Sequence, residues 1–137
     1  MPFESADLPE VVVMSFGFLH GVPPTAVGPL LVDLRQQLRD PHTDPALRQL
    51  NGLDQAVRTK VLTMPGAFEI IRFTAGQAQF LLRYNSTRNF MVRVLVGCQG
   101  GRHRSVVVAE QVAHTLSKRG IETAVEHQHI HFPVIER

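Results

Sequence analysis

The sequence is poor in several features that mark particular classes of protein. Its 137 residues include one cysteine, one tyrosine and no tryptophan, and the formal net charge is only +2. A single cysteine excludes an internal disulfide, so the composition does not indicate an oxidising compartment. No apolar run approaches the ~20 residues that cross a bilayer, and the acidic start of the chain does not fit a signal peptide. We therefore expect a cytoplasmic protein with no membrane partner.

The remaining composition is that of an ordinary globular protein. Hydrophobic residues make up 44% and charged residues 19% of the chain, which is enough apolar material for one folded domain of this length. A charge excess of +2 neither requires nor excludes a basic surface for nucleic acid. We place the domain at residues 11–137, after a flexible lead-in at residues 1–10.

Short apolar runs alternate with amphipathic segments along the chain. The apolar runs predict strands at 11–15, 30–33, 90–96 and 123–127, and helical spacing predicts helices at 53–62, 67–84 and 105–119. This alternation predicts an α/β fold: a single-domain sandwich with a mainly parallel central sheet and helices on its faces. Residues 36–53 are rich in turn formers and long enough to be a binding loop. The buried stripe of the helix at 67–84 is predicted to contain Phe68, Ile71, Ala75, Ala78, Leu81 and Leu82.

A glycine-rich turn connects the third predicted strand directly to the last predicted helix. It reads Cys98-Gln-Gly-Gly-Arg-His-Arg-Ser105. Backbone N–H groups of such a turn and of the helix N-terminus converge with positive partial charge, which favours an anion. The spacing of a nucleotide-binding Walker loop is absent. We predict that the turn binds a phosphorylated small molecule through Gly100, Gly101, Arg102, His103, Arg104 and Ser105.

The same turn supports a second interpretation, in which the protein is an enzyme. Cys98 and Arg104 have the Cys-x5-Arg-Ser spacing of the phosphate loop of cysteine-dependent phosphatases. There the thiolate attacks phosphorus while the arginine holds two phosphate oxygens. Asp33 or Asp40 would then have to supply the general acid. The opposing interpretation is that Cys98 is a buried, inert core residue.

Motifs outside the turn add a resemblance that covers residues 11–127. They occur in the order Val12-Val-Met-Ser-Phe-Gly-Phe18, Val32-Asp-Leu-Arg35, Asp40-Pro-His42, Asn51-Gly-Leu-Asp54 and Gly97-Cys-Gln-Gly-Gly-Arg-His-Arg-Ser105. Together they resemble the C-terminal domain family of the RNase adapter protein RapZ. In full-length members this domain follows a P-loop kinase-like domain, and this sequence contains no Walker motif. The resemblance therefore suggests a free-standing version of the second domain.

The resemblance implies a domain that binds glucosamine-6-phosphate and, in some members, a small regulatory RNA. The family's sugar-phosphate contacts fall on His42, Gly100, His103 and Arg104. Gln99 and Arg102 replace the usual threonine and lysine. Asp33 and Arg35 match the family's Asp-Val-Arg element and are expected to orient the site or to pair with each other.

The sequence supports three hypotheses about function. The first is a non-enzymatic sensor or adapter that binds a sugar phosphate without a cofactor, forms a homo-oligomer and acts on a protein or RNA partner. The second is the phosphatase with Cys98 and Arg104. The third is an RNA-binding adapter, although residues 126–137 carry one arginine where the RNA-binding members have a basic tail.

A metal site is the weakest prediction from the sequence. His127, His129 and His131 alternate and would share one face of a strand, as metal ligands can. No cysteine or carboxylate is placed to complete a ligand set. We therefore expect no metal.

Overall fold

The first strand, β1 (Val11–Gly17), is buried along almost its whole length. Its β-branched residues suit a central strand that is covered on both faces. In the computed structural model, which describes residues 8–24, 29–84 and 91–135, β1 lies between β3 (Val92–Cys98) and β4 (Thr123–His127). The strand β2 (Leu30–Asp33) pairs with the other edge of β3, and every pairing is parallel. The predicted α/β class with a parallel sheet is confirmed.

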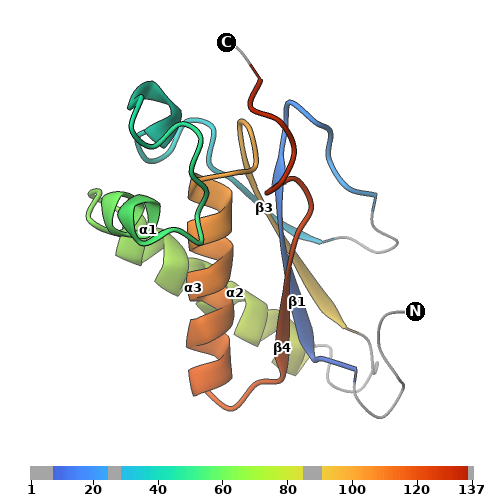
Figure 1. The fold of residues 1–137 in the computed structure, drawn as a ribbon. Coiled ribbons are helices and arrows are strands. Elements are labelled where there is room, and N and C mark those ends of the chain that lie inside the picture. The colour runs from blue at the N-terminus through green and yellow to red at the C-terminus, as the bar shows by residue number, and fades with distance from the viewer. Residues whose placement is uncertain (1–7, 25–28, 85–90, 136–137) are drawn as a thin grey trace.

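All four strands end at the same edge of the sheet, which we call the carboxyl edge. Gly17 lies opposite Cys98, Asp33 opposite Gly97, and His127 opposite Ser15. The connections that follow the strands therefore gather at this edge, seen at the top of Figure 1. In open α/β sheets ligands bind at this edge.

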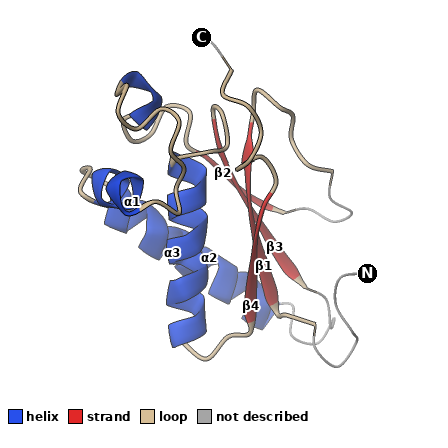
Figure 2. Ribbon diagram, in the orientation of Figure 1, coloured by secondary structure: helices blue, strands red, loops and turns tan. Residues whose placement is uncertain are grey.

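The helices α1 (Gln55–Leu62), α2 (Ala67–Tyr84) and α3 (Arg104–Lys118) all lie on one side of the sheet (Figure 2). The predicted sandwich of helices on a parallel sheet therefore has its described helices in a single layer on one face. Right-handed crossovers that run in opposite directions along a sheet cover opposite faces. Only the β1–β2 connection runs toward the β2 edge, and its described part contains no helix because Pro23 and Pro24 interrupt it.

The predicted boundaries of β2, β4 and α2 match the observed ones, and those of the other elements differ by one or two residues. The third strand continues two residues further than predicted, to Cys98, and α3 begins one residue earlier, at Arg104. Asp54 is the N-cap residue of α1 as predicted, but its Oδ2 accepts from the Asn51 N–H instead of capping the helix. Gly120 ends α3 with a φ of +81°, as a left-handed C-terminal residue should. The predicted start of β3 at Phe90 lies outside the described residues.

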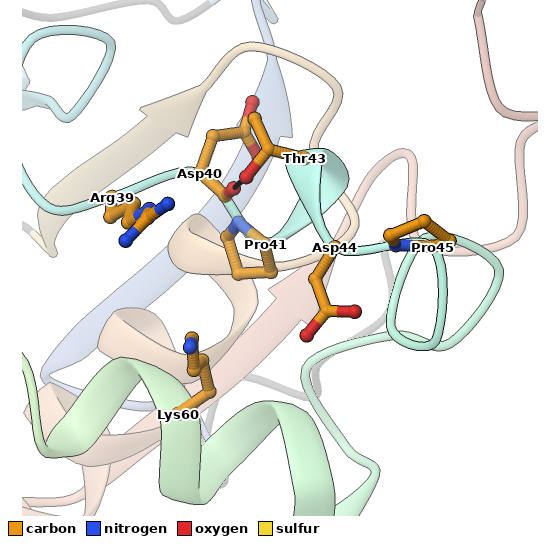
Figure 3. Close-up of a pocket in the computed structure, with 7 residues that line it drawn as sticks. All are labelled: Arg39, Asp40, Pro41, Thr43, Asp44, Pro45 and Lys60. Atoms are coloured by element: carbon orange, nitrogen blue, oxygen red, sulfur yellow. Dashed lines mark hydrogen bonds between the residues drawn. The ribbon is translucent and has the colours of Figure 1, made fainter.

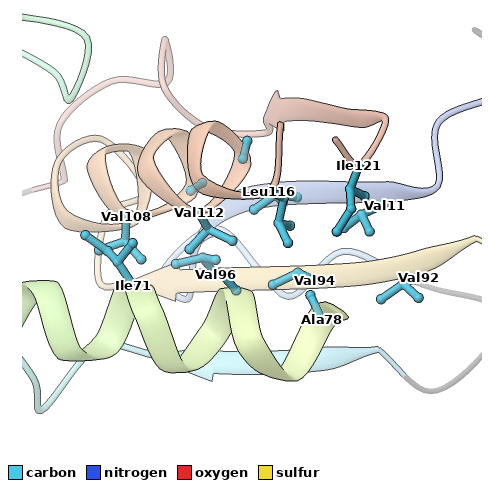
Figure 4. Packing of buried hydrophobic residues seen from close by; sticks show 14 of the residues in the cluster. Val11, Ile71, Ala78, Val92, Val94, Val96, Val108, Val112, Leu116 and Ile121 are labelled. Atoms are coloured by element: carbon cyan, nitrogen blue, oxygen red, sulfur yellow. The ribbon is translucent and has the colours of Figure 1, made fainter. Parts of the chain in front are cut away.

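The core lies between the sheet and α2 and α3. Val94 and Val96 of β3 pack against Val108 and Val112 of α3 and Ile71 of α2 (Figure 4). Each such side chain contributes about 1.5–3 kcal/mol of burial free energy. No helix in the described part of the chain is long and apolar enough to span a bilayer.

One residue of the predicted stripe on α2 is misplaced. Phe68 is 68% exposed, whereas Ala67 beside it is fully buried. The helix packs inward through small residues such as Ala75 and Ala78, so it approaches the sheet closely. Phe68 lies at the edge of that narrow contact and projects into solvent.

Candidate functional site

The β3–α3 loop, residues 99–103, crosses the carboxyl edge in close contact with the end of β1. A Cβ added to Gly17 would lie 2.3 Å from the carbonyl carbon of Gly100, and one added to Gly101 would lie 2.6 Å from the Gly17 nitrogen. Gly101 also has a φ of +77°. Only glycine fits this crossing, because any side chain would push the two backbones apart. The loop geometry is therefore fixed by contact with β1.

The backbone N–H groups of this loop and of the first turn of α3 form the main polar feature of the site. Within the described part of the chain, the N–H groups of residues 100–106 donate to no acceptor. The first turn of any helix leaves such donors, and the macrodipole adds positive potential there. No acidic side chain lies in the first turn of α3 to offset it. The loop is therefore a set of donors that suits an anion.

Arg104 is the most buried of the predicted ligand-binding side chains that carry a charge, with an exposed fraction of 2%. Its Nη1 donates to the carbonyl oxygens of Leu34, Gln37 and Leu38 at 2.8–3.2 Å. Its Nη2 lies 3.3 Å from Oδ2 of Asp40. The Nε is buried and has no acceptor among the described residues. Arg104 therefore holds the chain after β2 in place, and one donor of its guanidinium remains unused.

His103 is also buried and connects the loop to the segment that was predicted to be a binding loop. Its Nε2–H donates to the carbonyl oxygen of Leu47 at 3.1 Å. Burial lowers its pKa below the usual 6.5, although the hydrogen bond to Leu47 opposes that shift in part. Burial therefore favours the neutral form of the His103 imidazole.

His42 lies in the same segment, in a 3-10 helix at Pro41–Thr43. Its backbone N–H donates to Oδ1 of Asp40, and its carbonyl oxygen accepts from Nε of Arg48. Contacts of Arg104 with Asp40 and of His103 with Leu47 attach this segment to the β3–α3 loop. The structure therefore brings the His42 segment and the loop together, as the resemblance implies.

Arg102 binds the segment after β4, residues 130–132, to the carboxyl edge of the sheet. Its Nη1 donates to the carbonyl oxygens of Ile130 and Phe132, and its Nη2 to those of Gln49 and Leu50. Its Nε, like that of Arg104, is buried without an acceptor among the described residues. The planar guanidinium of Arg102 therefore joins two segments through its two Nη atoms, which a lysine ammonium could not match.

Cys98 and Ser105 lie below the loop, inside the protein. The Cys98 Sγ is 3.1 Å from Ser105 Oγ, and the two residues are 2% and 0% exposed. Cys98 packs in the core cluster with valines of β3 and α3. A phosphatase nucleophile has to reach its substrate, and the geometry here is that of a core residue. Gln99, which precedes the glycines, is half-buried and accepts from the Leu19 N–H through its carbonyl oxygen.

Asp33 and Arg35 form an exposed ion pair just after β2. The Arg35 Nη2 is 2.7 Å from Asp33 Oδ2, and the side chains are 46% and 41% exposed. The Arg35 hydrogen bond lowers the pKa of Asp33. Arg35 also lies over the Phe18 ring, with 3.7 Å between its Cζ and the ring centroid. Of the two expectations for this element, the structure shows the mutual pairing.

The three alternating histidines do not share one strand face, because β4 ends at His127. His127 contacts Ser15 Oγ and Glu110, whereas His129 accepts the Gly17 N–H through Nδ1 at 2.8 Å. His131 is exposed. Among the described residues no group of three metal-ligating side chains is assembled.

A cavity of about 300 Å³ lies beside the His42 segment and is separate from the glycine loop. Figure 3 shows Lys60 reaching from α1 toward the segment that carries Pro41, with Arg39 on the same wall. Asp40 lines this cavity and also contacts Arg104 below the loop. The cavity and the loop are therefore linked through the contact of Asp40 with Arg104, the residue that follows the loop. The complete lining is Arg39, Asp40, Pro41, Thr43, Asp44, Pro45 and Lys60.

Sequence reasoning missed the roles that three residues have in shaping the loop. The loop packs against Gly17, for which no role was predicted. His129, considered as a metal ligand, accepts the Gly17 N–H, and Asp40, considered as a general acid, pairs with Arg104. A glycine at the end of a buried strand is a signal that could have identified Gly17. The contact between His129 and Gly17 joins residues 112 positions apart, so no local pattern reveals it.

Comparison with known proteins places the chain in a family. The model of the RapZ C-terminal domain matches residues 9–131. A nucleotide-binding protein of Streptomyces coelicolor is 43% identical over 117 residues, 85% of this chain and 38% of that protein. A nucleotide-binding protein of Rubrobacter xylanophilus is 47% identical over 107 residues, 77% of this chain and 34% of that protein. The chain thus spans less than half the length of these relatives, and it belongs to the RapZ C-terminal domain family.

Proposed function

We propose that this domain is a non-enzymatic binding module for a small phosphorylated metabolite, of the sugar-phosphate class, seated at the β3–α3 loop. One observation carries the proposal. The loop and the first turn of α3 present N–H groups without acceptors, and the buried Nε atoms of Arg102 and Arg104 lack acceptors as well. Buried donors of this kind each cost about 1–3 kcal/mol when unsatisfied, and a phosphate offers several oxygen acceptors.

Family membership supports the same ligand class. The RapZ resemblance implies glucosamine-6-phosphate, with contacts on His42, Gly100, His103 and Arg104. The segment that carries His42 is attached to the loop through Asp40 and Leu47. A sugar joined to a phosphate in the loop would therefore lie toward this segment and toward the cavity that Arg39 and Lys60 line.

The roles of the two arginines follow from their contacts. Most N–H groups of Arg104 and Arg102 donate to carbonyl oxygens of the surrounding segments, so the main role of both side chains is to hold the site together. Each then has one Nε–H that could donate to a ligand. Cys98 belongs to the scaffold in this proposal. The two arginines contact different segments, so a ligand at the loop would affect both residues 34–50 and residues 130–132. Such a link from the ligand to two surface segments suits a sensor that acts on a protein or RNA partner.

Calorimetry with a matched ligand series tests the proposal. We expect glucosamine-6-phosphate to bind, inorganic phosphate to bind more weakly, and glucosamine, which lacks the phosphate, to give no heat. Adenosine monophosphate serves as the nucleotide comparison, since the relatives are named nucleotide-binding proteins. Equal binding of glucosamine and its phosphate would contradict a phosphate site.

A conservative variant separates binding from phosphatase chemistry. Cys98→Ser should leave sugar-phosphate affinity within a few-fold of the natural protein, because the thiol is in the core and not at the ligand. A phosphatase would instead lose aryl-phosphate hydrolysis completely in this variant. Measurable turnover by the natural protein that Cys98→Ser abolishes would replace the binding proposal with the enzymatic one.

A further inference from the structure

The outer face of α2 carries aromatic side chains that no described residue covers. Phe73, Phe80 and Tyr84 are 66%, 63% and 69% exposed. The rings of Phe80 and Tyr84 stack on each other with centroids 5.9 Å apart. Large apolar groups gathered on one surface of a soluble protein indicate an interaction site. Figure 4 shows that Ile71 and Ala78, on the opposite side of α2, point into the core.

Gly76 lies at the centre of this face. It is exposed, and a Cβ added there would meet no atom within 4 Å. A glycine inside a helix weakens the helix relative to alanine, and here neither packing within the chain nor a positive φ requires it. Its effect is to leave a shallow site between Phe73 and Phe80 where another helix could approach α2 closely. Small residues at a helix crossing permit such an approach.

The residues around Gly76 are arranged almost symmetrically along the helix. Phe73 lies three residues before it and Phe80 four residues after it, and at 3.6 residues per turn both fall on the same side of the face. Glu69 and Arg83 lie seven residues before and after Gly76, along the middle of the face. Both charged side chains are exposed, and no described residue pairs with either.

We propose that α2 is a homodimer interface, in which the helices of two copies of this chain cross antiparallel at Gly76. A two-fold axis there brings Phe73 of one copy against Phe80 of the other, twice. It also brings Glu69 of each copy near Arg83 of the other, so opposite charges flank the aromatic contact at both ends. A parallel arrangement would place like charges together, which favours the antiparallel form. This charge complementarity of α2 with itself is the reason for choosing a second copy as the partner.

Sedimentation equilibrium of the whole chain, with a matched pair of variants, tests the interface. The double variant Phe73→Asp/Phe80→Asp should raise the dimer dissociation constant by at least about 30-fold, the effect of removing a hot-spot contact. Phe68→Asp is the control, because Phe68 is 68% exposed on the same helix but lies about a third of a turn away from Phe73 and Phe80 around the helix axis. It should leave the dissociation constant within a few-fold of the natural protein.

Charge reversal provides a second readout that a folding defect cannot imitate. Glu69→Arg alone and Arg83→Glu alone should each weaken the dimer, while the double variant Glu69→Arg/Arg83→Glu should restore it. A cysteine at the crossing adds a covalent test. Gly76→Cys should form an intermolecular disulfide under mild oxidation, whereas His114→Cys, exposed on α3, should not.

Three results would overturn the proposal. The first is a natural protein that stays monomeric at high micromolar concentration. The second is a dimer that the Phe73→Asp/Phe80→Asp variant leaves intact, because another surface would then form it. The third is absence of rescue in the charge-swapped double variant together with absence of a crosslink in the Gly76→Cys variant.

Discussion

The β3–α3 loop at the carboxyl edge and the outer face of α2 both depart from the usual pattern of charged residues outside and apolar residues inside. The loop buries a charged group, whereas α2 exposes aromatic rings. At the loop a guanidinium, that of Arg104, is 2% exposed, whereas on α2 the aromatic ring of Tyr84 is 69% exposed. The buried cation is held by three carbonyl oxygens and Asp40. The exposed ring stacks on that of Phe80, which is itself 63% exposed. The loop has more hydrogen-bond donors than acceptors, and the outer face of α2 has apolar surface that no described residue buries.

The glycines of the two regions show the same contrast. Gly17 and Gly101 are needed because backbone atoms lie within 3 Å of where a Cβ would be. Gly76 has open space around it. Gly17 and Gly101 allow close backbone contact within the chain, whereas we infer that Gly76 allows close approach of a second copy. The atoms around each glycine distinguish the two roles. Three predictions test this comparison, from the largest expected effect to the smallest.

Removing the buried cation should have the largest effect. Arg104→Met is expected to lower the free energy of unfolding by about 4 kcal/mol, because it removes the cation beside Asp40 and the donor to three carbonyl oxygens. Urea denaturation measures it. Arg35→Met is the matched control, since Arg35 also pairs with an aspartate but at an exposed position, and its effect should be much smaller. Equal effects of the two substitutions would contradict the assignment of Arg104 to the scaffold.

Adding one methyl group should have opposite effects at the two kinds of glycine. Gly17→Ala is expected to lower the free energy of unfolding by about 3 kcal/mol, because its Cβ would overlap the Gly100 backbone. Gly76→Ala should raise it by about 1 kcal/mol, since alanine restrains the unfolded chain and meets no obstacle in the helix. Chemical denaturation at low micromolar concentration measures both, and destabilisation by Gly76→Ala would show that this glycine has a role within the monomer.

Lowering the pH should reduce the stability that the carboxyl edge contributes more than the stability that α2 contributes. Burial lowers the pKa of both His103 and His129 below 6.5, with His20 adding to the effect on His129. The unfolded chain then binds protons more readily than the folded one, so the stability these groups contribute is complete above pH 6.5 and is lost as the pH falls below it.

The melting temperature measured from about pH 8 to about pH 5 checks this expectation. His129→Asn should flatten the curve, because an amide oxygen can still accept from the Gly17 N–H but does not titrate in this range. His114→Asn, at an exposed helical position, should leave the curve unchanged. A melting temperature that rises on acidification would contradict the expected direction.

Much of the fold could be predicted from local sequence. The β-branched run before Gly17 and the periodicity of residues 67–84 specify a buried strand and an amphipathic helix, and both occur. The glycine-rich turn between strand and helix was placed correctly at the carboxyl edge. These features depend on neighbours within a few residues, which a single sequence displays.

The remaining features depend on residues far apart in the chain. The single helical layer follows from strand order, which local patterns do not contain. The acceptors for Arg104 are mainly backbone carbonyl oxygens, which every residue has, so no residue type marks them. Phe68 fitted the helical period but lies beside the contact because small alanines bring α2 close to the sheet.

The central claim is that an anion binds to the N–H groups of the β3–α3 loop, and nuclear magnetic resonance tests it most directly. In a titration of nitrogen-15-labelled protein with glucosamine-6-phosphate, we expect the largest shifts at the amides of Gly100 and Gly101 and at the Nε–H signals of Arg102 and Arg104. Amides near Gly76 should not move. Shifts confined to Thr43, Lys60 and the rest of the neighbouring cavity, with the two glycine amides unchanged, would contradict the account.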